Sequence, residues 1–324
     1  MTLMVLAIVF GLVLLVWSAD KFIEGASATA YYAGMPPILI GMIVVGFGTS
    51  APEMVVSTIA ALENNPGIAL GNAYGSNIAN IGLILGLTVL LKPLVVHSDI
   101  VKKELPLLIV FSFLAGSILI DGTLDFHDGY LLLLGFFILV CWSIYSGLKK
   151  KDDALGIDVE QEVSSNPHSL KYGVFWLITG LVLLIGSSRL LVWGSVSLAQ
   201  TFGVSDLIIG LTIIAIGTSL PELASSLVAV YKNEHDIAVG NVVGSNMFNI
   251  LAVIGIAGSI SETPVSEEVL YRDWVIMILL TLLLYFIVVL QKKKSILGRK
   301  TGILFLLIFF SYLTYLVFTT LNGN

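Results

Sequence analysis

Charge is scarce in this chain. Of its 324 residues only 12% are Asp, Glu, Lys or Arg, while 57% are hydrophobic, and the mean hydropathy is +0.98. A typical soluble domain is roughly 25% charged. The composition therefore excludes a water-soluble protein and predicts an integral, multi-pass membrane protein.

Cysteine is scarcer still. The single Cys141 excludes an intrachain disulfide, and because it lies in an apolar segment we expect a buried structural thiol. The sequence has no basic patch that would indicate nucleic acid, and it predicts neither a cofactor nor an obligatory protein partner. The apolar run 3–17 has no preceding Lys/Arg cluster and no clear cleavage site, so we expect it to be a retained membrane helix.

Apolar runs are what the chain has in abundance. A helix needs about 20 mainly apolar residues to cross the bilayer core. On that criterion the sequence predicts an all-α protein with ten spans, near 3–23, 36–62, 67–91, 105–121, 129–148, 171–200, 205–231, 236–260, 274–290 and 302–320. The hydrophilic stretch 149–170 is too short for a domain. We interpret it as a linker between two five-helix halves, 1–148 and 171–324.

The basic residues are distributed unevenly between the two predicted sides. Of the 16 Lys and Arg residues, only Arg189 and Arg272 fall in or near the loops of one side, and the remaining ones fall toward the other. Cytoplasmic loops carry the excess of positive charge. The pattern predicts that both termini lie outside and that the linker 149–170 is cytoplasmic.

The two halves contain an internal repeat. Residues 41–86 align without a gap to residues 210–255, at an offset of 169, with 19 identities in 46 positions. Because each half has an odd number of spans, the second copy must be inserted upside down. Inverted repeats are typical of secondary transporters, whose substrate site lies near the bilayer midplane where the halves meet.

Each copy carries "GTSxPE" within a predicted span. The four-residue spacing places the Thr and the Glu of each motif on one helix face. These residues are Thr49, Ser50 and Glu53 in the first copy and Thr218, Ser219 and Glu222 in the second. Pro52 and Pro221 lack an N–H group, so each removes a helical hydrogen bond. The backbone carbonyls of Gly46 and Ala215, just before these breaks, can turn toward a ligand.

The next span of each copy carries "GNxxGSNxxN". Its polar residues repeat the four-residue spacing, with Ser76 and Asn80 in the first copy and Ser245 and Asn249 in the second. The amides of Asn72, Asn77, Asn241 and Asn246 are either further ligands or caps of the helix breaks, and the sequence leaves both open. Neutral oxygen donors beside two carboxylates form the ligand set that Ca²⁺ and Na⁺ prefer.

The charge of the two carboxylates also favours Ca²⁺ or Na⁺ as the ligand. A carboxylate at a helix centre in the bilayer costs roughly 2.5 to 3.5 kcal/mol on insertion scales, so Glu53 and Glu222 require compensation. Together they carry the charge that balances one Ca²⁺ or two Na⁺. Glycine pairs at four-residue spacing, including Gly71 with Gly75, Gly82 with Gly86 and Gly240 with Gly244, predict close helix packing instead of ion binding.

These motifs resemble those of the sodium/calcium exchanger family of the cation/Ca²⁺ antiporter superfamily, and the ten-span layout extends the resemblance over the whole chain. The resemblance implies antiport of Na⁺ against Ca²⁺ with Glu53 and Glu222 as the central ligands. It further implies ligands at Thr49, Ser50, Thr218, Ser219, the carbonyls of Gly46 and Ala215, Ser76, Asn80, Ser245 and Asn249.

Departures from the motifs of related branches favour Na⁺ as the ion whose movement is coupled to that of Ca²⁺. The potassium-dependent branch typically has an Asp where this chain has Asn249, and the proton-coupled branch tends to have an acidic residue after the Gly-Asn pair. The short linker has no room for the Ca²⁺-sensing region of animal exchangers. A minimal bacterial exchanger in the inner membrane fits these features.

The sequence therefore predicts an antiporter, not an enzyme, that uses a Na⁺ gradient to expel Ca²⁺ by alternating access. Potassium-dependent Na⁺/Ca²⁺ exchange and H⁺/Ca²⁺ exchange are the alternatives within the class. A passive cation channel could use the same oxygens, although inverted repeats disfavour it. An intramembrane enzyme is disfavoured because the sequence shows no activated Ser with a His, no His-rich metal motif and no paired Asp.

Overall fold

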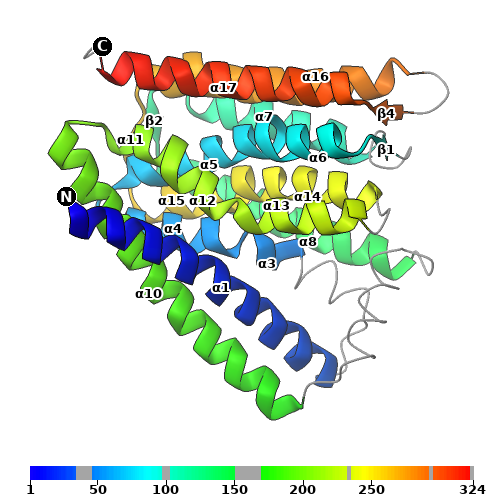
Figure 1. The fold of residues 1–324 in the computed structure, drawn as a ribbon, viewed down its shortest axis with the longest axis horizontal. Helices are drawn as coiled ribbons and strands as arrows, with labels where there is room; N and C mark the ends of the chain where they lie inside the picture. The colour runs from blue at the N-terminus through cyan, green and yellow to red at the C-terminus, as the bar shows by residue number, and fades with distance from the viewer. Residues whose placement is uncertain (34–45, 97–102, 150–168, 232–234, 292–294, 322–324) are drawn as a thin grey trace.

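The computed structural model describes residues 1–33, 46–96, 103–149, 169–231, 235–291 and 295–321, and these residues are almost entirely helical (Figure 1). The first half contains the helices α1 (Thr2–Tyr32), α3 (Gly46–Thr49), α4 (Ala51–Leu62), α5 (Pro66–Ala79), α6 (Gly86–Leu91), α7 (Leu105–Ile118) and α8 (Phe126–Lys149), the π-helical turn η2 (Asn80–Leu85), and the strands β1 (Leu94–Val96) and β2 (Thr123–Leu124).

The second half repeats this order of elements. It contains the helices α10 (Leu170–Phe202), α11 (Asp206–Ile209), α12 (Ala215–Thr218), α13 (Leu220–Tyr231), α14 (His235–Phe248), α15 (Ile254–Ile260), α16 (Val275–Val289) and α17 (Arg299–Leu321), the π-helical turns η4 (Gly210–Ile214), η5 (Asn249–Val253) and η6 (Val269–Trp274), and the strands β3 (Thr263–Pro264) and β4 (Ser295–Leu297).

Eight helical segments in the described part of the chain are long and apolar enough to cross a membrane. Two of the ten predicted spans are shorter: α7 is a 14-residue helix, and the span expected at 36–62 falls partly on residues 34–45, outside the described residues. The multi-pass helical architecture is confirmed. The count of ten spans and the N-out, C-out orientation stay predictions, as do the boundaries of the linker, since residues 150–168 also lie outside the described part.

The offset of 169 residues relates the structural elements as well as the sequence. It carries the bounds of α4 onto those of α13, and those of α5 onto those of α14. It also carries the first residue of η2, Asn80, onto the first residue of η5, Asn249. The two copies therefore share even their departures from regular α-helix.

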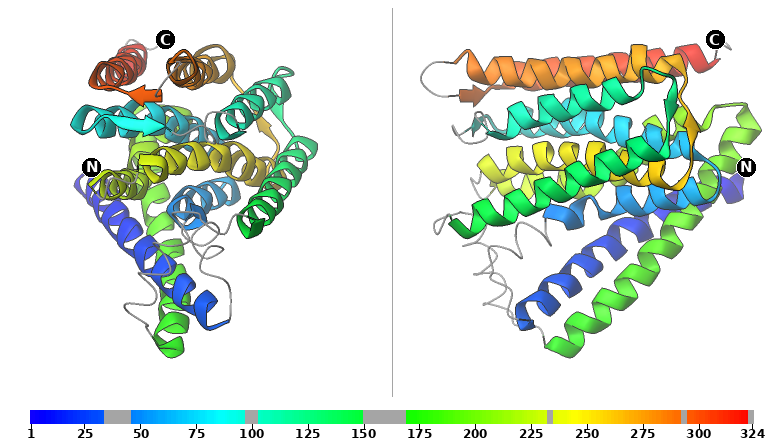
Figure 2. Two further views of the ribbon diagram at one scale, coloured as in Figure 1. Left: turned by 90° about the vertical axis from the view of Figure 1, so that its right-hand side faces the viewer. Right: turned by 180° about the vertical axis from the view of Figure 1, so that it is seen from behind.

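Two short β-ribbons join the halves at opposite ends of the bundle. Strand β1 pairs with β4 in the antiparallel sense, and β2 pairs with β3. The strands β1 and β3 are equivalent in the repeat, yet β1 lies at the right-hand end of Figure 1, whereas β3 pairs with β2 at the other end (Figures 1 and 2). The two copies thus run in opposite directions.

The helices α1 and α10 pack along each other and lean away from the rest of the bundle (Figures 1 and 2). The first span was expected to end near residue 23, but α1 continues to Tyr32. Its charged residues have partners: Lys21 pairs with Glu24 at 2.6 Å, and the Tyr172 hydroxyl of α10 donates to Glu24 at 2.7 Å. These contacts satisfy the charges that would otherwise favour ending the helix.

Glycines allow close approach in the centre of the bundle. A Cβ at Gly75 would lie 2.7 Å from Ala215 Cβ, and one at Gly82 would lie 2.9 Å from Phe309 Cβ. Gly71 and Gly86 are similarly crowded, so the predicted packing role of these two pairs is confirmed. For Gly240 and Gly244 no described atom lies within 4 Å of the added Cβ.

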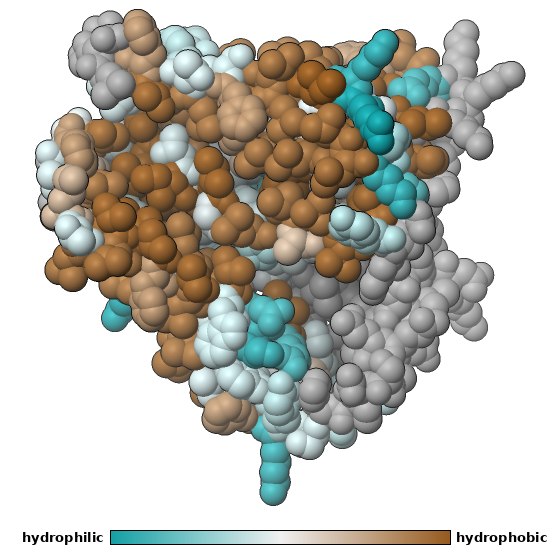
Figure 3. Space-filling view, in the orientation of Figure 1, coloured by the Kyte–Doolittle hydropathy of each residue, from teal (hydrophilic) through white to brown (hydrophobic). Residues whose placement is uncertain are grey.

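The exterior is mostly apolar, as Figure 3 shows for one face of the bundle. Exposed Leu, Ile, Val and Phe side chains cover the outer faces of α1, α8, α10 and α17. Cys141 lies on α8 and is exposed, so the expectation of a buried thiol is wrong. The apolar segment around it is a peripheral helix, in which hydrophobic residues face the surroundings as well as the core.

A buried charge cluster lies in η6, directly before α16 and away from the two repeated motifs. Asp273 is fully buried and accepts hydrogen bonds from Arg272 at 2.7 and 3.0 Å and from the Tyr312 hydroxyl of α17 at 2.7 Å. Buried charges are tolerated when they are paired in this way. The cluster links η6 to α17.

Candidate cation-binding site

The "GTSxPE" motifs interrupt their helices at the same position of each copy. Helix α3 ends at Thr49 and α4 begins at Ala51, with Ser50 between them at φ −88° and ψ 3°. Helix α12 ends at Thr218 and α13 begins at Leu220, with Ser219 at φ −83° and ψ 7°. Proline is favoured at the first positions of a helix because its missing N–H is not needed there. Each proline therefore lies in the first turn of a new helix, directly before the carboxylate residue.

The two carboxylates are fully buried, and each receives hydroxyl groups from the opposite copy. Glu53 Oε1 accepts a hydrogen bond from Ser219 Oγ at 3.3 Å. Glu222 Oε1 accepts one from Ser50 Oγ, also at 3.3 Å. The hydroxyl of Ser245 lies 3.3 Å from the same oxygen and 3.1 Å from Ser50 Oγ. The helix breaks thus face each other, and each carboxylate belongs to a site built by both halves.

Unsatisfied polar atoms concentrate around these carboxylates. In the described part of the chain eight buried side-chain N or O atoms lack a hydrogen-bond partner, and six of them belong to five residues of the two motifs: Glu53, Glu222, Asn77, Asn80 and Asn249. Buried polar groups in proteins are almost always satisfied. Five of these six atoms are oxygens, so the group that would satisfy them is an electron-pair acceptor such as a cation.

The amides of α5 and α14 cross between the copies. Asn80 Nδ2 donates to Asn246 Oδ1 at 2.9 Å, and Asn246 Nδ2 donates to the Asn77 carbonyl at 3.3 Å. Asn80 and Asn249 stand where their helices change from α to π geometry. Such π-helical turns are frequent at functional sites. No local sequence pattern predicts these turns apart from the repeat itself.

The question left open for Asn72 and Asn241 is answered by their hydrogen bonds. Asn72 Nδ2 donates to the Glu53 carbonyl at 3.2 Å and to Ser57 Oγ at 2.9 Å. Asn241 makes the equivalent bonds to the Glu222 carbonyl at 3.1 Å and to Ser226 Oγ at 3.2 Å. Both amides hold the carboxylate-bearing helices. The NH₂ group of each amide is therefore occupied by bonds within its own copy, which is the arrangement of a structural residue and not of a cation ligand.

The structure brings most of the predicted residues together. Those with cross-copy contacts or unsatisfied atoms at the centre are Glu53, Glu222, Ser50, Ser219, Ser245, Thr49, Thr218, Asn80 and Asn249. Ser76 donates to Asn72 at 3.5 Å, whereas its counterpart Ser245 contacts a carboxylate. The Ala215 carbonyl accepts the Ser219 amide at 3.1 Å within its helix. Gly46 begins α3 directly after undescribed residues.

The two central carboxyl groups have no basic counterpart in the described part of the chain. Within the described residues no Lys or Arg forms an ion pair with Glu53 or Glu222. The same residues contain no group of three or more His, Cys, Asp or Glu side chains that would hold a metal ion. A cation here would therefore be bound by two carboxylates supplemented by hydroxyl and amide oxygens, a hard ligand set suited to Na⁺ or Ca²⁺.

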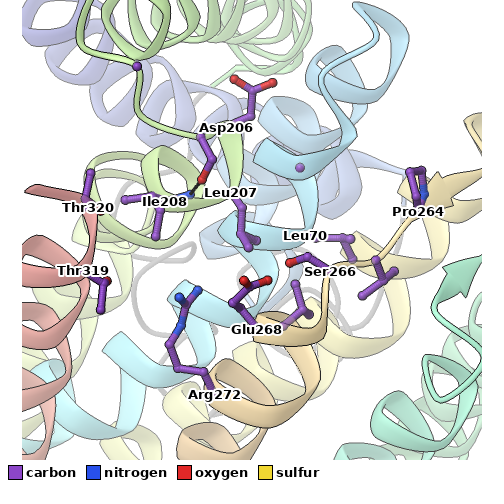
Figure 4. Close-up of a pocket in the computed structure, with 15 residues that line it drawn as sticks. Leu70, Asp206, Leu207, Ile208, Pro264, Ser266, Glu268, Arg272, Thr319 and Thr320 are labelled. Atoms are coloured by element: carbon purple, nitrogen blue, oxygen red, sulfur yellow. Dashed lines mark hydrogen bonds between the residues drawn. The ribbon is translucent and has the colours of Figure 1, made fainter. Parts of the chain in front are cut away.

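A separate cavity of ≈ 580 Å³ opens at the end of the bundle near α11 and β3. Figure 4 shows Arg272 and Glu268 among its lining residues. A hydrogen bond from Ser266 lowers the pKa of Glu268, so this carboxylate is negatively charged at neutral pH. None of the twelve predicted site residues lines this cavity, and it is distinct from the candidate site.

The oppositely directed copies, the interrupted helices and the shared central site define a secondary transporter. The model of the sodium/calcium exchanger protein family matches residues 3–145 and 172–318. The chain belongs to the sodium/calcium exchanger family, which is a family of transporters and not of enzymes.

Relatives and solved structures agree with this assignment. A putative antiporter, CaxA of Alkalimonas amylolytica, is 43% identical over 97% of this chain and 98% of its own. The inner membrane protein YrbG of Escherichia coli is 41% identical over 84% of this chain and 85% of its own. A structure of the sodium-calcium exchanger NCX_Mj, soaked with 10 mM Na⁺ and 10 mM Sr²⁺, superposes with a TM-score of 0.66 at 32% identity and covers 97% of this chain and 98% of that chain.

Proposed function

We propose that this protein exchanges Na⁺ for Ca²⁺ across the bacterial inner membrane by alternating access and that it exports Ca²⁺. The observation that carries the proposal is the pair of fully buried carboxylates, Glu53 and Glu222, each with one oxygen that has no partner among the described residues. The transported ions are the substrates, and the protein needs no further cofactor for this activity.

The donor set accounts for competition between the two ions. Two carboxylates balance one Ca²⁺ or two Na⁺, and both ions accept hydroxyl, amide and carbonyl oxygens. The proposed ligands besides the carboxylates are Thr49, Ser50, Thr218, Ser219, the carbonyls of Gly46 and Ala215, Ser76, Asn80, Ser245 and Asn249. Because both ions use the same carboxylates, one must leave before the other binds, which couples their movements.

The test is Ca²⁺ uptake into proteoliposomes that contain the purified protein. Uptake is expected only when internal Na⁺ exceeds external Na⁺, and it should proceed against a Ca²⁺ gradient, which a passive channel cannot do. Uptake that follows a K⁺ or pH gradient in place of the Na⁺ gradient would contradict Na⁺ coupling and favour one of the alternative exchangers.

Neutralising either carboxylate tests the site itself. A unit charge about 4 Å from a divalent ion contributes roughly 8 kcal/mol at an effective dielectric constant of 20, so Glu53→Gln and Glu222→Gln should each lower the flux by at least about a hundredfold. The matched control is Glu63→Gln, since Glu63 is exposed at the end of the same helix as Glu53. Flux that persists in either central variant would overturn the proposed site.

A further inference from the structure

The two asparagines that hold the carboxylate helices also reach the opposite copy. Thr218 Oγ1, on α12, donates to Asn72 Oδ1 at 3.0 Å. Thr49 Oγ1, on α3, donates to Asn241 Oδ1 at 3.5 Å. Each asparagine therefore connects the carboxylate helix of its own copy with a threonine of the other copy.

Hydrogen-bond chemistry fixes the direction of this connection. A backbone carbonyl can only accept, so the Glu53 carbonyl requires the NH₂ group of Asn72 to face it. The amide oxygen of Asn72 must then face Thr218. An amide oxygen only accepts, so the Thr218 hydroxyl donates its single proton to it at 3.0 Å, in preference to the Ala215 carbonyl at 3.4 Å.

The consequence concerns the lone pairs of the threonine oxygen. A hydroxyl that gives its proton to an amide oxygen keeps both lone pairs available in other directions. A cation is coordinated by lone pairs and repelled by a proton that points toward it. The orientation of the Thr218 proton toward Asn72 is thus the orientation that a cation ligand needs.

We propose that Asn72 and Asn241 are positioning residues that hold the hydroxyl protons of Thr218 and Thr49 away from the transported cation, so that the threonine oxygens can coordinate it. The inference rests on the proposed function, because it takes these threonines as cation ligands. It assigns to the two asparagines a role through the threonines and not as ligands themselves.

A double-mutant cycle tests whether Asn72 acts through Thr218. In the proteoliposome assay, Asn72→Leu and Thr218→Val should each raise the Ca²⁺ concentration that gives half-maximal flux by about tenfold, the effect of losing one well-placed polar interaction. The double variant should resemble the Thr218→Val variant, and the maximal flux should stay within about threefold of the wild type. Residues that act through each other are non-additive in this way.

A matched control separates positioning from simple attachment of α4 to α5. Ser57 Oγ is the side-chain acceptor of the Asn72 NH₂ group, but the Glu53 backbone carbonyl still orients that group when the Ser57 hydroxyl is removed. Ser57→Ala should therefore change the half-saturating Ca²⁺ concentration by less than about twofold. A Ser57→Ala effect as large as that of Thr218→Val would indicate that Asn72 only attaches the helices.

The opposite copy supplies an independent version of the experiment. Asn241 is only partly buried, so Asn241→Leu is expected to fold, and its cycle with Thr49→Val decides the question if Asn72→Leu does not accumulate in the membrane. Additive effects, about a hundredfold in the double variant, would overturn the inference. A wild-type protein without Na⁺-driven Ca²⁺ flux would instead refute the proposed function, so the two failures are distinguishable.

Discussion

Substituting alanine for Gly75 should push two central helices apart. The added Cβ would lie 2.7 Å from Ala215 Cβ and 2.8 Å from Leu211 Cα. Carbon atoms reach their optimal contact at about 3.5 to 4.0 Å, so α5 must move from η4 and α12 by roughly 0.7 to 1.3 Å. Overpacking of this kind costs about 1 to 3 kcal/mol.

The displacement would reach the site because the same helices carry Asn72 and Thr218. Their hydrogen bond is 3.0 Å long, and a shift of nearly 1 Å takes it beyond the usual range. We expect Gly75→Ala to lower the melting temperature of the purified protein by several degrees and to raise the half-saturating Ca²⁺ concentration by about tenfold, which corresponds to roughly 1.4 kcal/mol.

The matched control for Gly75→Ala is Gly186→Ala. Gly186 is exposed on α10, with no described atom within 4 Å of its added Cβ, so its substitution should leave both the melting temperature and the flux close to wild type. Equal melting temperatures and equal half-saturating Ca²⁺ concentrations in the two variants would refute the reasoning. So would a Gly75→Ala protein that transports as the wild type does.

Two further predictions test parts of the molecule outside the central site. Asp273→Asn removes the anionic partner of the half-buried Arg272 and should destabilise the protein by about 1 to 3 kcal/mol, measured by thermal denaturation; a melting temperature equal to that of the wild type would contradict a stabilising role of this cluster. In a Cys141→Ser background, Ser164→Cys in the predicted cytoplasmic linker should react with a membrane-impermeant maleimide in inverted membrane vesicles and not in intact spheroplasts. The reverse labelling pattern would contradict the predicted orientation.

The helix breaks and the central carboxylates were predictable from the sequence, because each depends on a local motif. Pro52 cannot continue the helix that precedes it, and Glu53 cannot lie in a bilayer without compensation. The repeat supplied the second half of the site, since the contact between Ser219 and Glu53 joins positions that no local pattern connects. The inverted repeat was therefore the feature of the sequence that indicated contacts between distant residues.

Other features depend on partners that the sequence does not reveal. The extension of α1 to Tyr32 depends on Tyr172 of α10, and the ribbon between β1 and β4 joins residues of different halves. The position of Cys141 could not be read from hydropathy, because the lipid-facing and the buried sides of a membrane helix are both apolar. The hydrogen bonds of Asn72 could not be predicted, because its acceptors on α4 are brought close to it only by the packing of α4 against α5.

The exchange of hydrogen bonds between the copies has a consequence for the transport cycle proposed above. Ser219 binds the carboxylate of the first copy, and Ser50 binds that of the second. A cation that coordinates Glu53 or Glu222 through the oxygen without a partner, Oε2, would leave both serine hydrogen bonds in place. Under the proposed function, each bound ion would therefore add coordination bonds across the repeat to hydrogen bonds that already bridge it.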